Sequence, residues 1–551
     1  MVTQNTYELL QTDVLIIGAG GAGLRAAIEA KKQGITTLIV TKEYLGGAHT
    51  SMAMGGLNVA IKKPATSKQH YQDTINGGWH INNYKMAKIF SKEMPERIYD
   101  LESYGVRFDK LPNGSFYTWA GGKQSAPLNL CAGDYTGREM IQGLIREIKL
   151  LRIPYLDDYF VTTLFTKEKT VIGVFLMDIK SGKYKIVNAR STIVATGGGG
   201  MMYLINTNAP SNTAEGYAWA IEVGASLVDM EMIQFHPTGI AYPPQKKGRL
   251  ITEKVRGHNG ILTNSKGERF MQRYQPKLME LAGRDEVSRA IYREIEEGRG
   301  TKNGGVYLDV RHWKKGDVER LIPDVFKEHK EMGIDIRKEV MEVSPSMHHM
   351  MGGININEWG ETNVNGLFAA GEVTRSVHGA NRLGGNSLAE GQVFGRRVGI
   401  RAAKSAKRQQ VIPITNVMIE NEVKRLSLYL NRKKGIDAKS LTHQLQTTMW
   451  NNVGLIRDKK RLKTAYKNIK RLKTKAKKLV ARNKKELQMC LELKCMIKTA
   501  HAIVIAALLR KESRGAHYRT DYPKMDPKWE KNIVVYQKNG LFKTRVVPVV
   551  K

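Results

Sequence analysis

The first forty residues carry two different hydrophobic patterns in succession. Residues 13–17 form a short β-branched and leucine-rich run that ends directly in glycines. A helical pattern follows over residues 22–33, and residues 37–40 form a second apolar run. This order of strand, glycine-rich turn, helix and strand predicts a βαβ unit.

Two later apolar runs also end in glycine turns. Residues 191–195 lead into Thr196 and four glycines, and residues 366–369 lead into Ala370, Gly371 and Glu372. Three strands of this kind predict one doubly wound α/β sheet that is assembled from distant segments of the chain.

The remaining patterns divide the chain into further domains. Residues 241–343 are typical of an α+β insertion between two parts of the sheet, and residues 401–511 are lysine-rich with apolar positions at helix spacing. We therefore predict a discontinuous dinucleotide-binding domain (1–240 and 344–400), a capping and substrate domain (241–343), a helical domain (401–511) and a C-terminal segment (512–551).

Length and composition indicate a large multidomain enzyme. The chain has 551 residues, of which 41% are hydrophobic, enough to bury more than one core. The first thirteen residues lack a secretory signal pattern. The late apolar run at residues 502–509 is far shorter than the roughly 20 residues that cross a bilayer. We expect a cytoplasmic protein that reaches the inner face of the cytoplasmic membrane only through partner subunits.

Three cysteines limit the redox chemistry of the chain. Cys131, Cys490 and Cys495 do not suggest a disulfide framework, and an iron–sulfur cluster usually takes four thiolates. The spacing of Cys490 and Cys495 suits half a metal site or, more simply, two ordinary helix positions. We expect no metal site here, so any clusters belong to another subunit.

The net charge of +36 is extreme. The excess is concentrated in residues 457–485, where Asp458 is the only acid. Such a run suits nucleic acid, an anionic membrane surface or a solvated helical face. No RNP-type aromatic pattern, zinc finger or helix-turn-helix accompanies it, so we favour the solvated face and regard nucleic acid as an unlikely partner.

The glycines after the first strand match a dinucleotide motif. Gly18, Gly20 and Gly23 fit G-x-G-x-x-G after a strand and at the start of a helix, where they permit a tight turn, close approach of a pyrophosphate and close helix packing. The acid that usually follows the second strand is missing, because Val40 precedes Thr41. Glu372 is the better candidate for a polyol chain.

Several further motifs occur in order along nearly the whole chain. They are Ala48-His49-Thr50 with Met54-Gly55-Gly56, Gly121-Gly122-Lys123-Gln124-Ser125, Gln234-Phe235-His236-Pro237-Thr238, Leu281-Ala282-Gly283-Arg284-Asp285, His348-His349-Met350-Met351-Gly352-Gly353, His378-Gly379-Ala380-Asn381-Arg382-Leu383-Gly384-Gly385-Asn386-Ser387-Leu388 and Glu512-Ser513-Arg514-Gly515-Ala516-His517-Tyr518. This series resembles the flavoprotein subunits of succinate dehydrogenase and fumarate reductase. The resemblance implies a Rossmann-like FAD-binding domain with an inserted capping domain, and interconversion of succinate and fumarate by hydride transfer to or from FAD.

The resemblance also assigns the substrate-binding and catalytic residues. The resemblance implies that the dicarboxylate is bound by His236, Thr252, His348 and Arg382. It implies that Arg284 transfers the proton and receives it from Glu253 and Arg256. An arginine can hold a carboxylate through two charge-assisted hydrogen bonds. Because the pKa of arginine exceeds about 12, the residues alone favour Arg284 as a second carboxylate clamp, and its proton role rests on the resemblance.

For FAD, the resemblance points to residues from all parts of the first domain. They are Gly18, Gly20, Gly23, Thr41, Lys42, His49, Thr50, Gly56, Glu215, Glu372, Ser387 and Leu388. His49 stands where the family attaches FAD covalently. Four positions depart from the family pattern: Glu215 replaces aspartate, Ala120 replaces phenylalanine, and His258-Asn259 replaces Glu-Gly.

Alternative functions differ in cofactor attachment or electron partner. L-Aspartate oxidase shares the fold and much of the motif set but does not use the covalent histidine. A soluble fumarate reductase driven by thiols differs only in its electron donor, and a basic binding protein with a relic flavin fold would have an idle site. The family precedent implies that the partner is an iron–sulfur subunit, joined in membrane-bound versions by anchor subunits.

Overall fold

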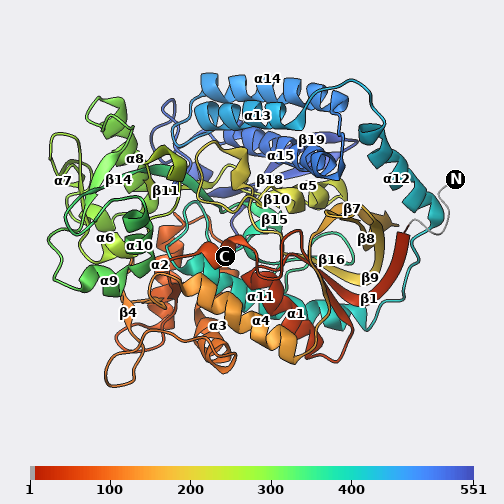
Figure 1. The fold of residues 1–551 in the computed structure, drawn as a ribbon, viewed down its shortest axis with the longest axis horizontal. Helices are drawn as coiled ribbons and strands as arrows, with labels where there is room; N and C mark the ends of the chain where they lie inside the picture. Colours follow the sequence, from red (N-terminus) through yellow and green to blue (C-terminus); the bar gives the residue numbers. More distant parts are fainter. Residues whose placement is uncertain (1–6) are drawn as a thin grey trace.

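The computed structural model describes residues 7–551 and contains a seven-stranded sheet, of which β1, β7, β8 and β9 lie at the right of Figure 1. Its strand order is β6-β2-β1-β9-β8-β7, with β16 pairing β9. The strands are β1 (Tyr7–Ile17), β2 (Thr37–Val40), β6 (Tyr155–Leu156), β7 (Tyr159–Lys167), β8 (Thr170–Asp178), β9 (Tyr184–Val194) and β16 (Leu367–Ala369). The predicted α/β sheet is confirmed, because β1, β9 and β16 are parallel neighbours although up to 350 residues of chain separate them.

Two helices beside this sheet pack closely against each other. The helix that follows the first glycine turn, α1 (Gly21–Lys31), packs against α11 (Asn386–Ala406). A Cβ on Gly399 would lie 2.3 Å from the carbonyl oxygen of Ala26, so only glycine permits this approach. The other helices of this region are α2 (Ser67–Gly77), α3 (Tyr84–Ser103), α4 (Thr136–Leu150) and α5 (Glu215–Glu222), and a small sheet joins β3 (Leu57–Asn58), β5 (Asn129–Leu130) and β4 (Thr118–Trp119).

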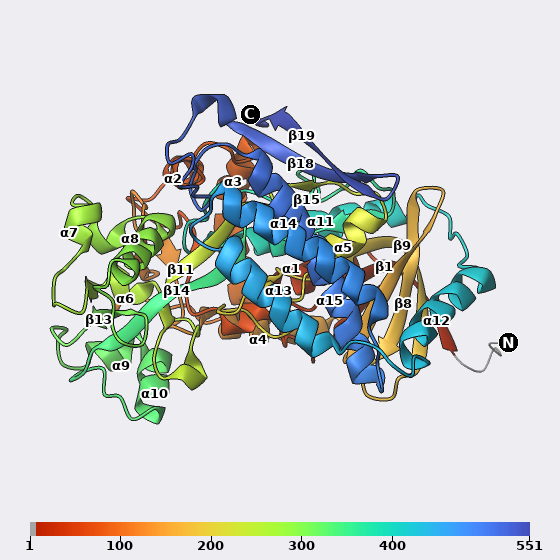
Figure 2. The same ribbon diagram turned by 90° about the horizontal axis from the view of Figure 1, so that it is seen from above.

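The inserted region has a sheet and a hydrophobic core of its own (Figure 2, green). Its strand order is β11-β14-β13-β12. The strands are β11 (Ile233–Ile240), β12 (Ile261–Thr263), β13 (Val306–Asp309) and β14 (Met341–Met350), and the helices are α6 (Lys254–Gly257), α7 (Met271–Tyr274), α8 (Arg284–Glu296), α9 (Asp317–Leu321) and α10 (Pro323–Glu331). Because β11 and β14 extend beyond residues 241–343, we propose wider bounds, 233–350, for the capping domain.

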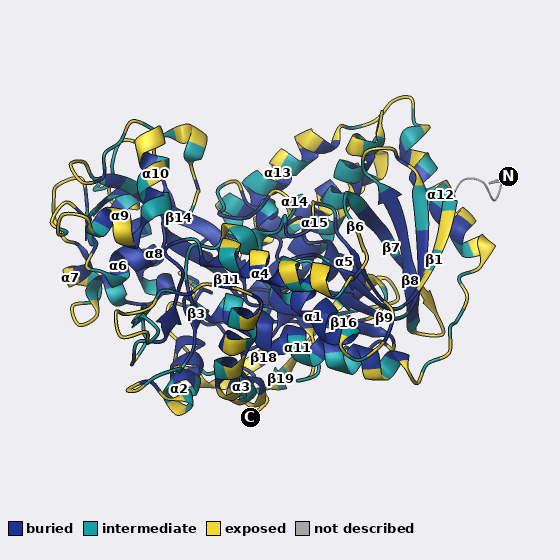
Figure 3. Cartoon of the chain, turned by 60° about the horizontal axis from the view of Figure 1, so that its bottom comes forward, coloured by how far each residue is buried: buried dark blue, intermediate teal, exposed yellow. Residues whose placement is uncertain are grey.

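The helical region packs around one long central helix. The helices are α12 (Asn416–Leu430), α13 (Ala438–Asn452), α14 (Lys459–Lys475) and α15 (Lys484–Leu509). In α14 the buried residues Leu462, Ala465, Ile469 and Leu472 recur at helix spacing, whereas Lys463, Lys467 and Lys470 are exposed. The basic run therefore covers an outer helix face, with buried strands concentrated in the interior (Figure 3).

The C-terminal segment returns to the first domain. The hairpin of β18 (Lys531–Lys538) and β19 (Leu541–Pro548) completes a five-stranded sheet with β10 (Leu227–Val228), β15 (Gly353–Asn355) and β17 (Thr374–Arg375). Buried Arg510 at the end of α15 ties this junction together, since it donates to Glu231 at 2.6 Å and to Glu512 at 3.0 Å. Among residues 7–551, no helix is long and apolar enough to cross a membrane, and no three His, Cys, Asp or Glu side chains are grouped as metal ligands.

Candidate functional site

Three glycine turns meet at one edge of the seven-stranded sheet. Ile17 at the end of β1 pairs with Val194 at the end of β9, and Val194 pairs with Ala369 at the end of β16. The chain turns sharply after each of these strands. Ligands of open α/β sheets bind in the crevice outside the carboxyl ends of the strands, so this edge is the expected place for a dinucleotide.

Each glycine of the first turn has a different structural environment, which a side chain would affect differently. Gly18 has φ +111°, and a Cβ there would meet the carbonyl oxygen of Ala195 at 2.3 Å. A Cβ on Gly23 would meet the carbonyl oxygen of Gly18 at 2.0 Å. A Cβ on Gly20 would make only ordinary contacts, with Thr50 Oγ1 at 3.4 Å and Ala48 Cβ at 3.5 Å. The turn therefore leaves the start of α1 accessible to a phosphate group.

A single cavity extends from this edge toward the capping domain. It encloses about 1550 Å³ of space not occupied by atoms, including its open mouth. All but two of the predicted site residues line it: Gly18, Gly20, Thr41, Lys42, His49, Thr50, Gly56, Glu215, His236, Thr252, Glu253, Arg284, His348, Glu372, Arg382, Ser387 and Leu388.

The two remaining predicted residues lie behind the cavity wall. Gly23 is buried in α1 against the glycine turn. Arg256 donates to the carbonyl oxygen of Glu280 at 2.6 Å and lies 3.7 Å from the carboxylate of Glu253. Both act on residues of the wall and do not face the cavity.

Lys42 is held entirely by protein partners. Its ammonium donates to Thr213 Oγ1 at 2.6 Å, to Glu492 of α15 at 3.0 Å and to Glu215. Since a lysine has three N–H donors, these partners take all of them. Lys42 therefore supports the Glu215 carboxylate, and Glu492 of the helical domain contacts this lysine from outside the cavity lining.

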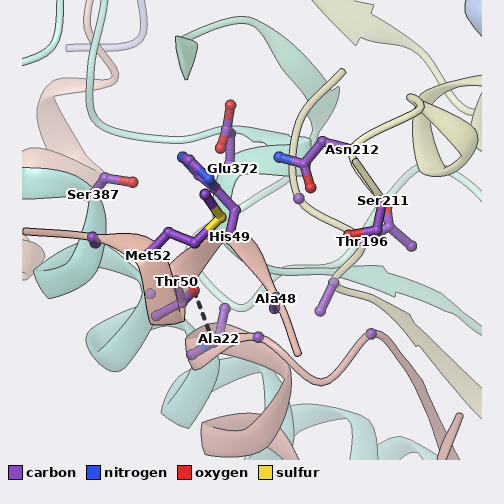
Figure 4. Close-up of a pocket in the computed structure, with 18 of the residues that line it drawn as sticks. Ala22, Ala48, His49, Thr50, Met52, Thr196, Ser211, Asn212, Glu372 and Ser387 are labelled. Carbon is purple, nitrogen blue, oxygen red and sulfur yellow. Dashed lines mark hydrogen bonds between the residues drawn. The ribbon is translucent and has the colours of Figure 1, made fainter. Parts of the chain in front are cut away.

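His49 and Glu372 lie beside each other on one wall, with Ser211, Asn212 and Thr196 across the cavity (Figure 4). The His49 ring is partly accessible from the cavity, while its Nδ1 is buried and has no hydrogen-bond partner among residues 7–551. Burial lowers the pKa of His49, which favours a neutral imidazole. Thr50, the next residue, accepts a hydrogen bond from the backbone N–H of Gly21 at 3.2 Å.

Two histidines on adjacent strands face each other at the far end of the cavity. His236 on β11 and His348 on β14 have ring centroids 5.0 Å apart. Burial, reinforced by nearby arginine charges, lowers the pKa of both rings well below its usual value. The backbone N–H of Thr238 donates to Nδ1 of His236 at 3.2 Å, so the proton of this neutral ring is on Nε2, which can donate to a ligand.

Arg284 and Glu253 form a hydrogen-bonded charged pair on the cavity wall. Nε of Arg284 donates to Glu253 at 2.6 Å, and Nη1 donates to Gln234 at 3.2 Å. The backbone N–H of Gly122 donates to the other Glu253 oxygen at 2.8 Å. Burial alone raises the pKa of Glu253, but the charges of Arg284 and Arg256 outweigh it and hold the pKa at about 2. Glu253 is therefore ionised at neutral pH.

Arg382 is a buried guanidinium that makes few hydrogen bonds to the described residues of the protein. Among the described residues its side chain donates one hydrogen bond, to the carbonyl oxygen of Leu383 at 3.4 Å, and its Nε has no partner. Burial, together with the charge of Arg284, lowers its pKa well below the usual value. A buried unpaired charge is costly, and an incoming carboxylate would relieve that cost.

Several lining residues were missed by the sequence analysis. Thr196 follows β9, and its place at a strand end was a usable signal. His349 adjoins His348 in a motif, and its Nδ1 lies 3.4 Å from Glu372. Ser211 and Asn212 carried no sequence signal, because only the folded chain brings them opposite His49.

The cavity fits FAD by its shape and by its donor groups. The glycine turn leaves room for a pyrophosphate beside a helix start, and Glu215 and Glu372 place carboxylates on the wall for hydroxyl groups. His49 lines the same space, and its buried Nδ1 has no hydrogen-bond partner among residues 7–551. The arginines and histidines then surround a separate region at the capping-domain end.

Comparisons with known proteins agree with this geometry. The family model "FAD binding domain" matches residues 13–388, and "Fumarate reductase flavoprotein C-term" matches residues 442–550. The chain is 43% identical over 540 residues to the A subunit of fumarate reductase (CoM/CoB) from Methanothermobacter marburgensis, covering 96% of this chain and 98% of that protein. It is 34% identical to the mitochondrial succinate dehydrogenase [ubiquinone] flavoprotein subunit of Oryza sativa subsp. japonica, covering 98% and 90%.

A solved structure of E. coli quinol fumarate reductase FrdA has a TM-score of 0.93 at 30% identity and covers 99% of this chain and 97% of that one. With matches of this extent across the FAD-binding and C-terminal regions, the chain belongs to the succinate dehydrogenase/fumarate reductase flavoprotein family, FAD-dependent oxidoreductases that act on CH–CH bonds.

Proposed function

We propose that this chain is the catalytic subunit of a fumarate reductase that converts fumarate to succinate in the cavity of Arg284 and Arg382. One observation carries the proposal. Residues suited to a dicarboxylate, namely His236, His348, Arg284 and Arg382, line the same cavity as the glycine turn and His49. A site for a small diacid therefore adjoins a site for a flavin.

Binding of the substrate follows from charge and hydrogen bonding. Arg382 supplies a guanidinium for one carboxylate, and the neutral rings of His236 and His348 orient the other end together with Thr252. Because these groups are buried, their charge interactions are stronger than in water. Positive charge near the substrate carboxylate also stabilises enolate-like charge as the reaction proceeds.

Proton transfer is assigned to Arg284, with Glu253 and Arg256 behind it. Arg284 donates a hydrogen bond to the ionised Glu253 at 2.6 Å, and Arg256 lies at ion-pair distance, 3.7 Å, from the same carboxylate, so the three charged groups are in succession from the cavity inward. When bound and reduced by the electron partner, FAD would supply the hydride that adds to one alkene carbon. Arg284 delivers the proton to the neighbouring carbon, and Glu253 holds its guanidinium in place.

The electron donor is proposed to be a thiol system that acts through an iron–sulfur subunit. The relative named for CoM/CoB is 43% identical, against 34% for the mitochondrial succinate dehydrogenase subunit. The same relative's name favours fumarate over aspartate as substrate.

Co-purification with native partners tests the electron donor. We expect a pair of thiols to be oxidised to a disulfide when fumarate is added, with one succinate formed per disulfide, as measured by thiol titration and organic-acid analysis. Quinol oxidation without thiol oxidation would refute the proposed donor, and oxidation of L-aspartate in place of fumarate reduction would refute the reaction.

Covalent attachment of FAD to His49 gives a second prediction. Acid-precipitated wild-type protein should keep its yellow colour in the pellet, whereas His49→Ser should release its flavin into the supernatant, because the imidazole nitrogen that forms the bond is gone. His312→Ser, at an exposed histidine, is the matched control and should behave as wild type. A colourless wild-type pellet would show that the flavin is not covalently bound.

Removal of the proton donor gives a third prediction. Arg284→Gln should lower fumarate reduction by reduced viologen dye by at least about 100-fold, the lower range of general acid catalysis, with flavin content per protein unchanged. Arg320→Gln, at an exposed arginine, controls for the substitution type. An Arg284→Gln protein with full flavin and near wild-type turnover would exclude this residue as the proton donor.

A further inference from the structure

The segment that carries Thr252, Glu253 and Arg256 belongs to the capping domain, yet contacts with residues of the first domain fix its position. Lys254 lies between the two cavity residues and the rest of α6. Its side chain is 2% exposed, and its ammonium donates to the carbonyl oxygen of Gly133 at 3.0 Å. The carboxylate of Asp109 lies 3.9 Å away. A buried ammonium is costly without such partners, so the Lys254 side chain can take few other positions.

A second contact across the same boundary starts from the end of α6. Nε2 of His258 lies 2.9 Å from the hydroxyl of Tyr117, which precedes β4 in the first domain. The other ring nitrogen, Nδ1, lies 2.9 Å from the carbonyl oxygen of Lys254. The ring therefore joins the short helix to the first domain at its far end.

A third contact holds α10 of the capping domain. Both carboxylate oxygens of Asp134 accept backbone hydrogen bonds at 3.0 Å, from the N–H groups of Asp324 and Val325. Ile322 precedes this helix and provides no side-chain cap, so a residue of the other domain fills the role of an N-cap. Asp134 is fully buried, and the contact is therefore shielded from water.

We propose that these contacts form an interdomain clasp, defined as Lys254 with Gly133, His258 with Tyr117, and Asp134 with the start of α10, which positions Thr252 and Glu253 for the reaction. Lys254 and Asp134 are positioning residues that touch neither substrate nor flavin. Four residues of helix cannot fix their own orientation by backbone hydrogen bonds alone, whereas contacts at both ends of α6 do so. This inference rests on the proposed function for the identity of the reaction.

Two variants test the clasp. Lys254→Met keeps the aliphatic length but removes the donor, and Asp134→Asn keeps the volume but loses one of the two acceptors. Each should lower kcat for fumarate by about tenfold or more, since small displacements of positioned groups cost up to about 100-fold. Flavin content should be unchanged, and malonate, followed through the flavin absorbance, should bind more weakly. Lys246→Gln, whose partner Glu328 lies in the same domain, should match wild type.

Hydrogen exchange of the holoenzyme gives a readout that needs no turnover. Residues 252–257 and 323–331 should exchange faster in both variants, with β1 and β9 unchanged. A kcat per bound flavin within twofold of wild type, or unchanged exchange in both segments, would overturn the clasp. If Lys254→Met fails to bind flavin, Asp134→Asn decides by the same criteria. If the wild-type protein does not reduce fumarate, the proposed function fails, and the exchange data alone decide whether the clasp exists.

Discussion

The free-energy cost of burying positive charge determines which ligand suits the capping-domain end of the cavity. Arg284, Arg256 and Arg382 are buried around one cavity end, where Glu253 pairs with Arg284 and Arg256, and the nearby charges of Glu372 and Glu253 act on Arg382 without a direct ion pair. Desolvating guanidinium groups is expensive unless they are paired. An acidic ligand would supply the carboxylate partner that Arg382 lacks among the described residues. The excess positive charge therefore selects for a dicarboxylate, and the protein must hold the arginines apart rigidly for that selection to work.

The cavity is rigid because different structural elements fix its two ends. The flavin end of the cavity is built on the carboxyl ends of three parallel strands, which fix the glycine turns through the sheet. The substrate end is built on β11, β14 and the start of α8 in the capping domain. Lys254 and Asp134 then join the two domains at buried positions. Chemistry at the boundary between two domains requires such contacts, because small displacements of reacting groups reduce the rate strongly.

The sequence predicted what is encoded locally. The βαβ unit, the glycine turns and the run of outward lysines on α14 follow from short-range pattern. Through the family resemblance, the ordered motifs also identified residues at both ends of the cavity. The rest depends on long-range contact. The pairing of β18 with β10 joins residues about 300 positions apart, and the loss of all three Lys42 donors to protein partners appears only once Glu492 is in place. Lys254 carried no signal at all, because a lysine in a basic chain is ordinarily a surface residue.

The buried cationic pocket beside the flavin site is proposed to bind a diacid. Titration of malonate into holoenzyme, followed by the flavin absorbance, measures this directly in wild type and in Arg382→Gln. We predict saturable binding in wild type and an affinity at least about tenfold weaker in the variant, the loss expected for hydrogen bonds to a charged group, with flavin content equal in both. Equal malonate affinity in the two proteins, or no spectral response in wild type, would contradict the account.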